Sequence, residues 1–576
     1  MPGPSPRYRW ILPDGGDLPP ELAASGRERG LASRLLSILV ARGHRDPASL
    51  AALFDDPIAS LHDPALLPGA DAFLARLRRA RAADERVLVF GDFDADGLTG
   101  LAILVRALRS LGLDVAPYVP NRLDEGHGLS LAAVERARSE GRTLIVTVDT
   151  GTSSVSEVAA AGDAGIDVLI TDHHRPPPRL PDAVAIVNPH LDGSSYPNRD
   201  LAGSGVAFKL AQLVLRDRPG GVAAALDMAD LAAVGSLADV VPVVGENRAI
   251  VRLGLARLRT APRPAFAALL REAGIAPERL DRDSIGFAIA PRLNAMSRMG
   301  DAAAAAALLL TDDAAEADTL AAELQSANLA RRELTVTALA EARVLAAAEA
   351  DAPAIVVLGD WPVGIIGLVA GRLADDGARP AVVVTRAADP WRGSARSPAG
   401  FDLAGAFAMC GDLFERHGGH AAAAGCSMRA EDYPAFRERF LSLAAGLPPA
   451  DTRPALSIDL VVTADAVDYA FLRELAPLEG SGDPPPLIAI SGLVLSRVRP
   501  ASGGHLQLTF RRGREVLDGI AFGRAENLAG QLHEDQALDI VARLASRTFG
   551  GFESLQLEVK DVAAAGGLGA TGRLAA

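Results

Sequence analysis

The amino-acid sequence predicts an α/β protein with a doubly wound parallel sheet, a long connecting helix, a second, smaller α/β domain and a C-terminal β-barrel. Three observations predict this architecture. Between residues 86 and 172, short apolar runs alternate with amphipathic helical patterns, as in parallel strands joined by helices. Residues 301–351 contain neither glycine nor proline and keep a helical period over most of their length. After the proline-rich segment 446–454, short alternating apolar and polar runs indicate a small barrel.

The elements of the first sheet follow one another in chain order. RVLVF (86–90) is expected to form a buried strand, and the next segment, 98–112, is an amphipathic helix with apolar residues at every third or fourth position. The strands DVAPYV, TLIVTVD and DVLITD then alternate with the helices SLAAVERARSEG and SSVSEVAAAGDAG. A second α/β segment begins at PAIVVLGD and continues through RPAVVVTR, beyond the helix-forming stretch.

Composition and charge limit the possible functions. The formal net charge of −14 argues against attraction of nucleic acid to the whole surface, although a local basic channel stays possible. Two cysteines, Cys410 and Cys426, form no CxxC pair, which fits a reducing compartment. The N-terminus lacks the apolar core of a signal peptide, and no apolar run approaches the ~20 residues that span a bilayer. We therefore expect a cytoplasmic protein that makes no use of a membrane.

Acidic and imidazole side chains follow three of the predicted strands. They are Asp92, Asp94 and Asp96 after the first strand, Asp149 after TLIVTV, and Asp172, His173 and His174 after DVLIT. An acid after one strand is usually a helix cap, but the carboxyl ends of parallel strands share one edge, so these groups should meet there. Clustered carboxylates need a cation, and oxygen and nitrogen ligands suit Mn²⁺ or Mg²⁺. Such a cluster can hold two ions and predicts metal-assisted phosphoester hydrolysis.

The motifs DFDADG, VDTG and TDHH, in this order, resemble the DHH phosphoesterase superfamily, and within it the RecJ family of bacterial single-strand-specific 5′→3′ DNA exonucleases. Further segments carry the same resemblance over residues 86–562. They are LAGSGVAFKL, ADLAAVGSLADVVPVVGENR, PRLNAMSRMGDA, GIIGLVAGRL, GSARS and RHGGHAAAAG. The sequence departs from the family pattern at Phe90, His127 and Ser297, none of which is a proposed ligand.

The resemblance implies roles for individual residues. The implied metal ligands, for two Mn²⁺ or Mg²⁺ ions, are Asp94, Asp96, Asp149, His173 and Asp239. The implied catalytic residues, which orient ligands or meet the scissile phosphate, are Asp92, Asp172 and His174. The implied phosphate-binding residues are Arg122, Arg292, Ser394, Arg396 and His420. Arginine suits this task because its planar fork matches phosphate oxygens.

The resemblance also implies five segments and their functions. They are an N-terminal helical extension (1–84), a DHH catalytic domain (85–312), a connecting helix (313–352), a DHH-associated domain (353–447) and an OB-fold single-strand-binding domain with a tail (448–576). The expected function is metal-dependent 5′→3′ degradation of single-stranded DNA in repair and recombination. Single-strand-binding protein and a RecQ-type helicase are the expected protein partners.

Two other classes of function stay open at this point. A small-substrate DHH phosphoesterase (a nano-RNase, a cyclic-dinucleotide phosphodiesterase or a pyrophosphatase) needs only the two α/β domains, so the additional C-terminal region favours a polymer substrate. A non-catalytic scaffold would have lost acids, whereas every acid of DFDADG, VDTG and TDHH is present.

Overall fold

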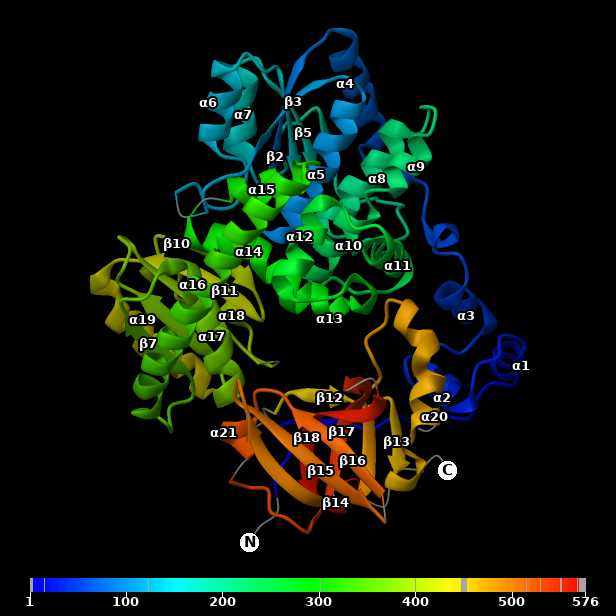
Figure 1. The fold of residues 1–576 in the computed structure, drawn as a ribbon. Helices are drawn as coiled ribbons and strands as arrows, with labels where there is room; N and C mark the ends of the chain where they lie inside the picture. The colour runs from blue at the N-terminus through cyan, green and yellow to red at the C-terminus, as the bar shows by residue number, and fades with distance from the viewer. Residues whose placement is uncertain are drawn as a thin grey trace. The chain divides into compact units, whose positions relative to one another are not determined.

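The computed structural model describes residues 4–14, 16–122, 124–300, 302–398, 400–446, 453–513, 515–528, 530–549, 552–566 and 568. The chain divides into two compact units (Figure 1). Residues 56–446 form one, here the α/β unit, and residues 1–55 with 447–576 form the other, here the barrel unit. The predicted N-terminal extension (1–84) is therefore divided between them, while the predicted boundary at 447/448 lies outside the described residues.

The first sheet of the α/β unit has five strands in the order β3-β2-β4-β5-β6. Every neighbouring pair is parallel, so the prediction of a doubly wound parallel sheet is confirmed. The strands are β2 (Arg86–Gly91), β3 (Asp114–Tyr118), β4 (Leu144–Val148), β5 (Asp167–Thr171) and β6 (Ala185–Val187). The strand order reverses beside β2, and in sheets of this kind ligands bind at the carboxyl ends next to that reversal.

Helices cover both faces of this sheet (Figure 1). They are α4 (Ala70–Ala82), α5 (Ala95–Ser110), α6 (Leu131–Ser139), α7 (Val155–Asp163) and α8 (Gly203–Leu215). Val87 and Val89 of β2 pack in the core that includes α5 and α8, whereas Leu88 and Phe90 pack in the core that includes α6 and α7. Alternate residues of a strand point to opposite faces, so a strand buried on both sides is apolar throughout.

A helical layer follows the sheet and packs partly against α5 and α8. Its helices are α9 (Gly221–Leu226), α10 (Ala229–Ala238), α11 (Gly245–Thr260), α12 (Pro264–Ala273), α13 (Arg282–Ser284), α14 (Ala290–Met299) and α15 (Ala303–Leu310), with a π-helical turn at Ile285–Ile289. The long helix α16 (Ala314–Ala347) starts at Asp313, whose side chain caps it by accepting hydrogen bonds from Ala315 N and Glu316 N. The helix-forming stretch 301–351 is thus one short and one long helix.

The second sheet of the α/β unit has the order β10-β11-β9-β8-β7. Its elements are β7 (Ile355–Gly359), α17 (Val363–Gly377), β8 (Ala381–Thr385), β9 (Trp391–Arg396), α18 (Leu403–Met409), β10 (Arg416–His420), β11 (Ala423–Met428) and α19 (Tyr433–Ala445). Only β7 and β8 pair in parallel; the remaining neighbours are antiparallel. α16 packs against α14 and also against α17 and β7, so it connects the two sheets.

The barrel unit contains β13 (Leu460–Thr463), β14 (Ile488–Ala501), β15 (His505–Arg512), β16 (Glu515–Ala521), β17 (Gln536–Phe549) and β18 (Phe552–Ala564), with helices α20 (Tyr469–Leu475) and α21 (Ala525–Leu528). Pairing of β14 with β17 closes a five-stranded barrel, as predicted. The N-terminal segment belongs to the same unit. Its elements are β1 (Arg9–Ile11), α1 (Pro20–Glu28), α2 (Ser33–Ala41) and α3 (Pro47–Phe54), and β1 pairs in parallel with β12 (Ala455–Ser457).

The expectation that no apolar run approaches the length that spans a bilayer was too strong. Among the described residues, one helical stretch, Gly221–Ala238, is long and apolar enough to cross a membrane by length and composition, and 67% of it is buried. A buried core helix passes the same test, so this is weak evidence for a membrane span.

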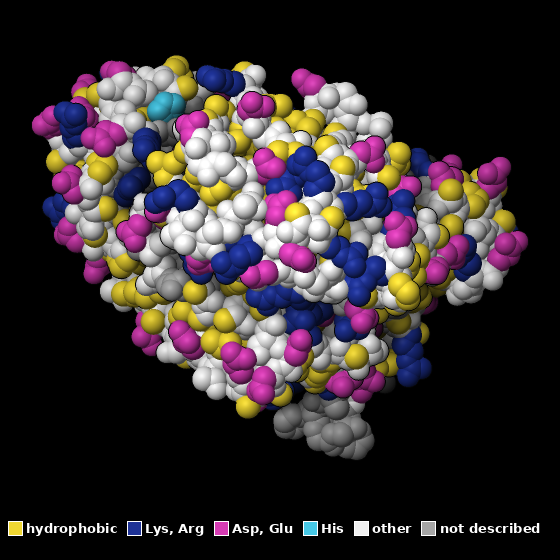
Figure 2. All heavy atoms as spheres, turned by 90° about the horizontal axis from the view of Figure 1, so that it is seen from above, with side chains coloured by type: hydrophobic (Ala, Val, Ile, Leu, Met, Phe, Trp, Pro, Cys, Tyr) yellow, Lys and Arg dark blue, Asp and Glu magenta, His cyan; other side chains and the backbone are white. Residues whose placement is uncertain are grey.

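The face seen in Figure 2 carries basic and acidic side chains close together.

Candidate functional site

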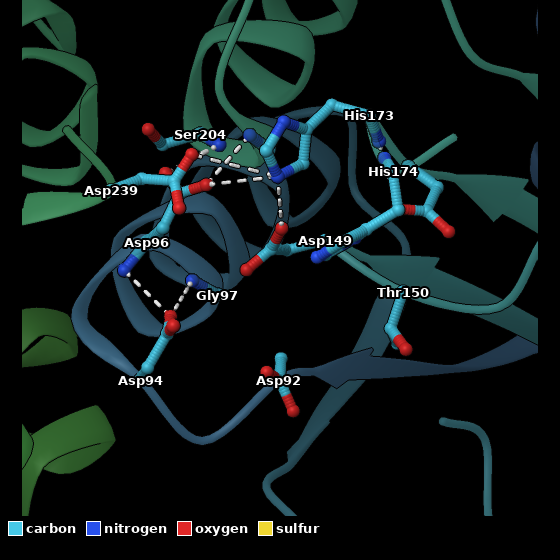
Figure 3. Close-up of polar contacts among 12 residues, drawn as sticks. Asp92, Asp94, Asp96, Gly97, Asp149, Thr150, His173, His174, Ser204 and Asp239 are labelled. Carbon is cyan, nitrogen blue, oxygen red and sulfur yellow. Dashed lines mark hydrogen bonds and ion pairs between the residues drawn. The ribbon is translucent and has the colours of Figure 1, made fainter. Parts of the chain in front are cut away.

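The first acids lie in the tight turn between β2 and α5. Asp94 caps α5, because its Oδ1 accepts hydrogen bonds from Asp96 N and Gly97 N, both at 3.0 Å. Gly97 makes this turn possible, since a Cβ at this position would lie 2.5 Å from Asp92 O. The cap and the glycine together bring the side chains of Asp92, Asp94 and Asp96 to one end of the strand (Figure 3).

Asp96 is held by the N-terminus of α8. Its Oδ2 accepts from Gly203 N at 2.7 Å and its Oδ1 from Ser204 N at 3.0 Å. These N–H groups have no partner within the helix, and the helix dipole favours a negative charge there. α10 also approaches closely, because a Cβ on Gly235 would lie 2.6 Å from Asp96 Oδ1. The Asp96 carboxylate is therefore fixed in position and fully buried.

Asp149 follows β4 in a strained conformation, with φ of 61°. Non-glycine residues seldom adopt this left-handed region, and such strain is concentrated at functional sites. α8 packs directly against the side chain, since a Cβ on Gly203 would lie 2.5 Å from Asp149 Oδ1. The strained backbone conformation of Asp149 thus directs its carboxylate toward the other acids.

His173 joins the acids from β2, β4 and α10. Its Nε2 lies 3.1 Å from Asp149 Oδ1, 3.7 Å from Asp239 Oδ2 and 3.9 Å from Asp96 Oδ2 (Figure 3). Three overlapping groups have ligand atoms within 4.8 Å of one another. They are Asp96, His173 and Asp239; Asp149, His173 and His174; and Asp92, Asp94 and Asp149. All five implied metal ligands are therefore brought together.

The electrostatics of this cluster favour a cation. Burial and the neighbouring carboxylates raise the pKa of Asp94 to about 6 and the pKa of Asp239 to about 8, and they raise the pKa of Asp149 well above its usual value. Burial lowers the pKa of His173, so its imidazole is neutral and can act as a ligand.

Three ligand atoms of the cluster also lack hydrogen-bond partners. Among the described residues, Asp92 Oδ1, Asp149 Oδ1 and His173 Nε2 are buried and accept or donate no hydrogen bond. A buried polar atom without a partner is costly, and divalent cations bound in the overlapping groups would satisfy these atoms. The residues present therefore fit a metal centre with oxygen and imidazole ligands, as Mn²⁺ and Mg²⁺ prefer.

Asp172 and His174 form a pair beside the cluster. Asp172 Oδ1 lies 2.8 Å from His174 Nδ1 and also accepts from His173 N, and Asp172 Oδ2 accepts from Thr152 N. The hydrogen bond to Asp172 raises the pKa of His174 to about 9. Burial would raise the pKa of Asp172, but the bonds to His174 and Thr152 outweigh it and lower that pKa to about 2. This pKa favours a protonated imidazole at neutral pH in the metal-free protein.

A basic cavity of about 370 Å³ lies in the same unit. Its charged lining residues are Arg122, Arg298, Arg392, Arg396, Arg416 and His417, and Ser394 contributes a hydroxyl. Burial and the nearby arginines lower the pKa of Arg298 to about 10, while Asp94 partly opposes this effect. Arg122 is linked to the acids as well, because Asp92 and Asp94 oppose the lowering of its pKa by burial. The cavity therefore adjoins the acidic cluster and suits an anion.

Two of the expected phosphate-binding residues do not line this cavity. Arg292 donates from Nη1 to Ala288 O and from Nη2 to Glu272 O, at 2.7 and 3.3 Å, so its guanidinium is bound to backbone carbonyls. His420 is exposed at the end of β10, while Arg416 and His417 of the same strand reach the cavity. Sequence reasoning missed Arg298, Arg416 and His417, although all three stand in the motifs quoted above.

The departures from the family pattern have a simple structural basis. Phe90 is buried in the α6/α7 core, where it stacks on Tyr118 at 5.5 Å. Ser297 is buried on α14 and donates to Asn294 O. His127, which is largely exposed, lies with Nδ1 3.5 Å from Asp92 Oδ2. Phe90 and Ser297 are thus core residues, whereas His127 borders the site.

Comparisons with known proteins agree with this geometry. Three family descriptions match, namely the DHH family N-terminal domain over residues 86–236, the DHHA1 domain over 351–446 and the RecJ OB domain over 458–561. The RecJ single-stranded-DNA-specific exonuclease of Bacillus subtilis is 36% identical over 537 residues, which cover 92% of this chain and 67% of the relative. The Salmonella typhimurium RecJ exonuclease is 35% identical, over 86% of this chain and 90% of the relative.

A solved structure with the same fold is also similar. The crystal structure of RecJ from Thermus thermophilus in complex with Mn²⁺ has a TM-score of 0.81 and 32% identity, covering 97% of this chain and 80% of that one. The same protein was also solved in complex with Mg²⁺ and matches with a TM-score of 0.76.

Proposed function

The chain belongs to the RecJ family of single-stranded-DNA-specific exonucleases, and on that premise we propose that it hydrolyses phosphodiester bonds of single-stranded DNA at the acidic cluster. The observation that carries this proposal is the position of unpartnered ligand atoms on Asp92, Asp149 and His173 beside an arginine-lined cavity. The small-substrate alternative is not favoured, because the barrel unit matches the RecJ OB domain.

The acidic cluster and the arginine-lined cavity have separate tasks in this mechanism. Asp94, Asp96, Asp149, His173 and Asp239 would hold two divalent cations, Mn²⁺ or Mg²⁺. The bound cations would supply Lewis-acid polarisation of the scissile phosphate and activation of a water nucleophile. Arg122 and Arg396, with Ser394, bind phosphate oxygens through charge-assisted and neutral hydrogen bonds.

The chain's own catalytic residues complete the site. Asp172 holds the Nδ1–H of His174, which directs the other ring nitrogen away from Asp172. A protonated imidazole at this place stabilises charge that develops on the phosphate and can deliver a proton to the leaving oxygen. Asp92, with a free Oδ1, orients the nucleophile or binds a cation directly.

The direction of degradation is proposed as 5′→3′, with the phosphate of the 5′ end bound in the arginine-lined cavity. Single-strand-binding protein and a RecQ-type helicase are the proposed partners, and the cytoplasm is the proposed location. These assignments rest on the family resemblance.

The test compares hydrolysis of single-stranded DNA labelled at either end, with Mn²⁺, alongside duplex DNA, a dinucleotide and pyrophosphate. We expect mononucleotides to be released from the 5′ end of single-stranded DNA, and Asp149→Ala to abolish this release. Asp163→Ala, on the exposed end of α7, is the matched control and should keep full activity. Preferred cleavage of the dinucleotide or of pyrophosphate would overturn the proposal.

A further inference from the structure

In the loop that carries Asp239, Val243 is partly buried and packs against the core, whereas the start of the loop is exposed. Asp239 ends α10, with its N–H donating to Gly235 O at 2.9 Å. The next residue, Val240, has φ of 62° and is 84% exposed. A β-branched residue in the left-handed region is strained, and this one gains no packing in return. Besides Val243, a further contact along the loop helps to keep Asp239 in place.

Asn247 in the first turn of α11 supplies that contact. Its side chain is fully buried, and its Nδ2 donates to Pro242 O in the Asp239 loop at 3.0 Å. The same Nδ2 donates to Asp200 O at 2.6 Å, and Oδ1 accepts from Asn198 Nδ2 at 3.0 Å. Both amide hydrogens face carbonyl oxygens, so the amide can take only this orientation.

Asp200 leads directly into the segment that holds Asp96. The buried residues Leu201 and Ala202 follow it, and Gly203 and Ser204 then donate their N–H groups to the Asp96 carboxylate. Asn247 thus joins the loop that carries Asp239 to the segment that fixes Asp96. These two acids, together with His173, form one of the candidate metal groups.

Glu246, next to Asn247, fixes the start of α11. It accepts from His62 N and Tyr196 OH, both at 2.8 Å, and pairs at 3.0 Å with the fully buried Lys209 of α8. The first turn of α11 is therefore anchored to α8 independently of Asn247. A rigid anchor of this kind lets one amide set the distance between two loops.

We propose that Asn247 is a positioning residue for the metal centre, which sets the separation of Asp239 from Asp96. It touches neither substrate nor cation and acts through the backbone of the two segments. The inference rests on the proposed metal-dependent function. Loss of residues that orient metal ligands typically weakens metal affinity by about 10–100-fold.

The test measures Mn²⁺ binding to the full-length protein by calorimetry, with thermal unfolding of the metal-free protein beside it. Asn247→Asp keeps the volume but places an oxygen against the carbonyls of Asp200 and Pro242, and Asn247→Ala removes all three bonds. We expect the Mn²⁺ dissociation constant to rise by about tenfold or more in both variants. We also expect hydrolysis to recover when the Mn²⁺ concentration is raised.

Two further variants separate positioning from general destabilisation. Asn198→Ala removes the donor to Asn247 Oδ1 and the acceptor of Asp200 N, but it keeps both hydrogen bonds from Asn247 Nδ2 and should weaken Mn²⁺ binding less. Asn328→Ala removes another buried asparagine, whose hydrogen bond to Arg331 stays within α16, and should leave Mn²⁺ affinity unchanged. Wild-type Mn²⁺ affinity in both Asn247 variants, or an equal loss in Asn328→Ala, would overturn the inference. Absence of DNA hydrolysis by a wild-type protein that binds Mn²⁺ would count against the proposed function alone.

Discussion

Gly203→Ala should impair catalysis although Gly203 is not a ligand. An added Cβ would lie 2.5 Å from Asp149 Oδ1 and 2.7 Å from Asp149 Cγ. Non-bonded heavy atoms are most stable about 3.5–4.0 Å apart, so either Asp149 or the start of α8 must move by about 1 Å. A shift of α8 would also displace Asp96, because Gly203 N donates to its Oδ2.

The magnitude follows from that displacement. Misplacing a group by about 1 Å in a catalytic arrangement costs about 100-fold in rate. Since each tenfold change corresponds to about 1.4 kcal/mol, the variant should lose about 2.7 kcal/mol of transition-state stabilisation. Asp149 is 3% exposed, and the close packing around it leaves its neighbours little room to move. The displacement should therefore move the Asp149 carboxylate itself.

The assay is kcat/KM for release of mononucleotides from single-stranded DNA at saturating Mn²⁺, with the melting temperature measured for every variant. Gly205→Ala is the matched control on the same helix. Its Cβ would meet the Leu201 side chain at 3.3 Å, which a small side-chain movement relieves, and alanine is favoured over glycine in a helix by about 1 kcal/mol. A folded Gly203→Ala protein with wild-type kcat/KM would refute the reasoning.

Three other predictions concern phosphate binding, protonation and the barrel unit. Arg396→Ala should lower kcat/KM by about 10–100-fold without changing Mn²⁺ affinity, since a charge-assisted hydrogen bond contributes about 1.5–3 kcal/mol; an unchanged kcat/KM would remove Arg396 from the site. The raised pKa values of Asp94, about 6, and Asp239, about 8, mean that the folded metal-free protein binds more protons than the unfolded chain above the unfolded-state pKa. Its stability should therefore fall as pH rises toward 8, and Mn²⁺ should remove this slope; a melting temperature in EDTA that rises over this range would contradict it. Residues 56–446 alone should still cleave short oligonucleotides but should lose affinity for long single strands at moderate salt. Equal affinity of residues 56–446 and the full-length protein for long single strands across a salt series would disprove this.

The sequence predicted the acidic edge of the sheet because one simple rule determines where residues that follow parallel strands lie. Asp92, Asp149 and Asp172 each follow a strand, and parallel strands present their carboxyl ends at one edge. Asp239 follows no such rule. It ends a helix of the layer beyond the sheet, so its placement depends on how α10 packs against α5 and α8. Only resemblance to a family indicated it from the sequence.

The arginines show the limit of reasoning from a motif. Arg292 and Arg298 lie six residues apart on α14, which at 3.6 residues per turn places them on different sides of the helix. The sequence alone does not reveal which side faces the cavity, because that depends on α16 and α17 packing around α14. The sequence predicted an N-terminal helical extension but not that residues 1–55 belong to the barrel unit, since the pairing of β1 with β12 joins residues far apart in the chain.

Net charge was the least informative property for the site, and the reason is physical. The total of −14 sums charges over the whole surface, whereas binding depends on which charges are buried and unpaired. The acids of the cluster lie beside one another and need a cation, while Arg122, Arg298 and Arg396 line a cavity that suits an anion, where burial, and for Arg298 and Arg396 also neighbouring arginines, lowers their pKa. Each half is destabilised without its ligand, and a phosphodiester bound beside divalent cations would satisfy both. The mutual repulsion within each half, which composition cannot reveal, is therefore what makes the site selective for that pair of ligands.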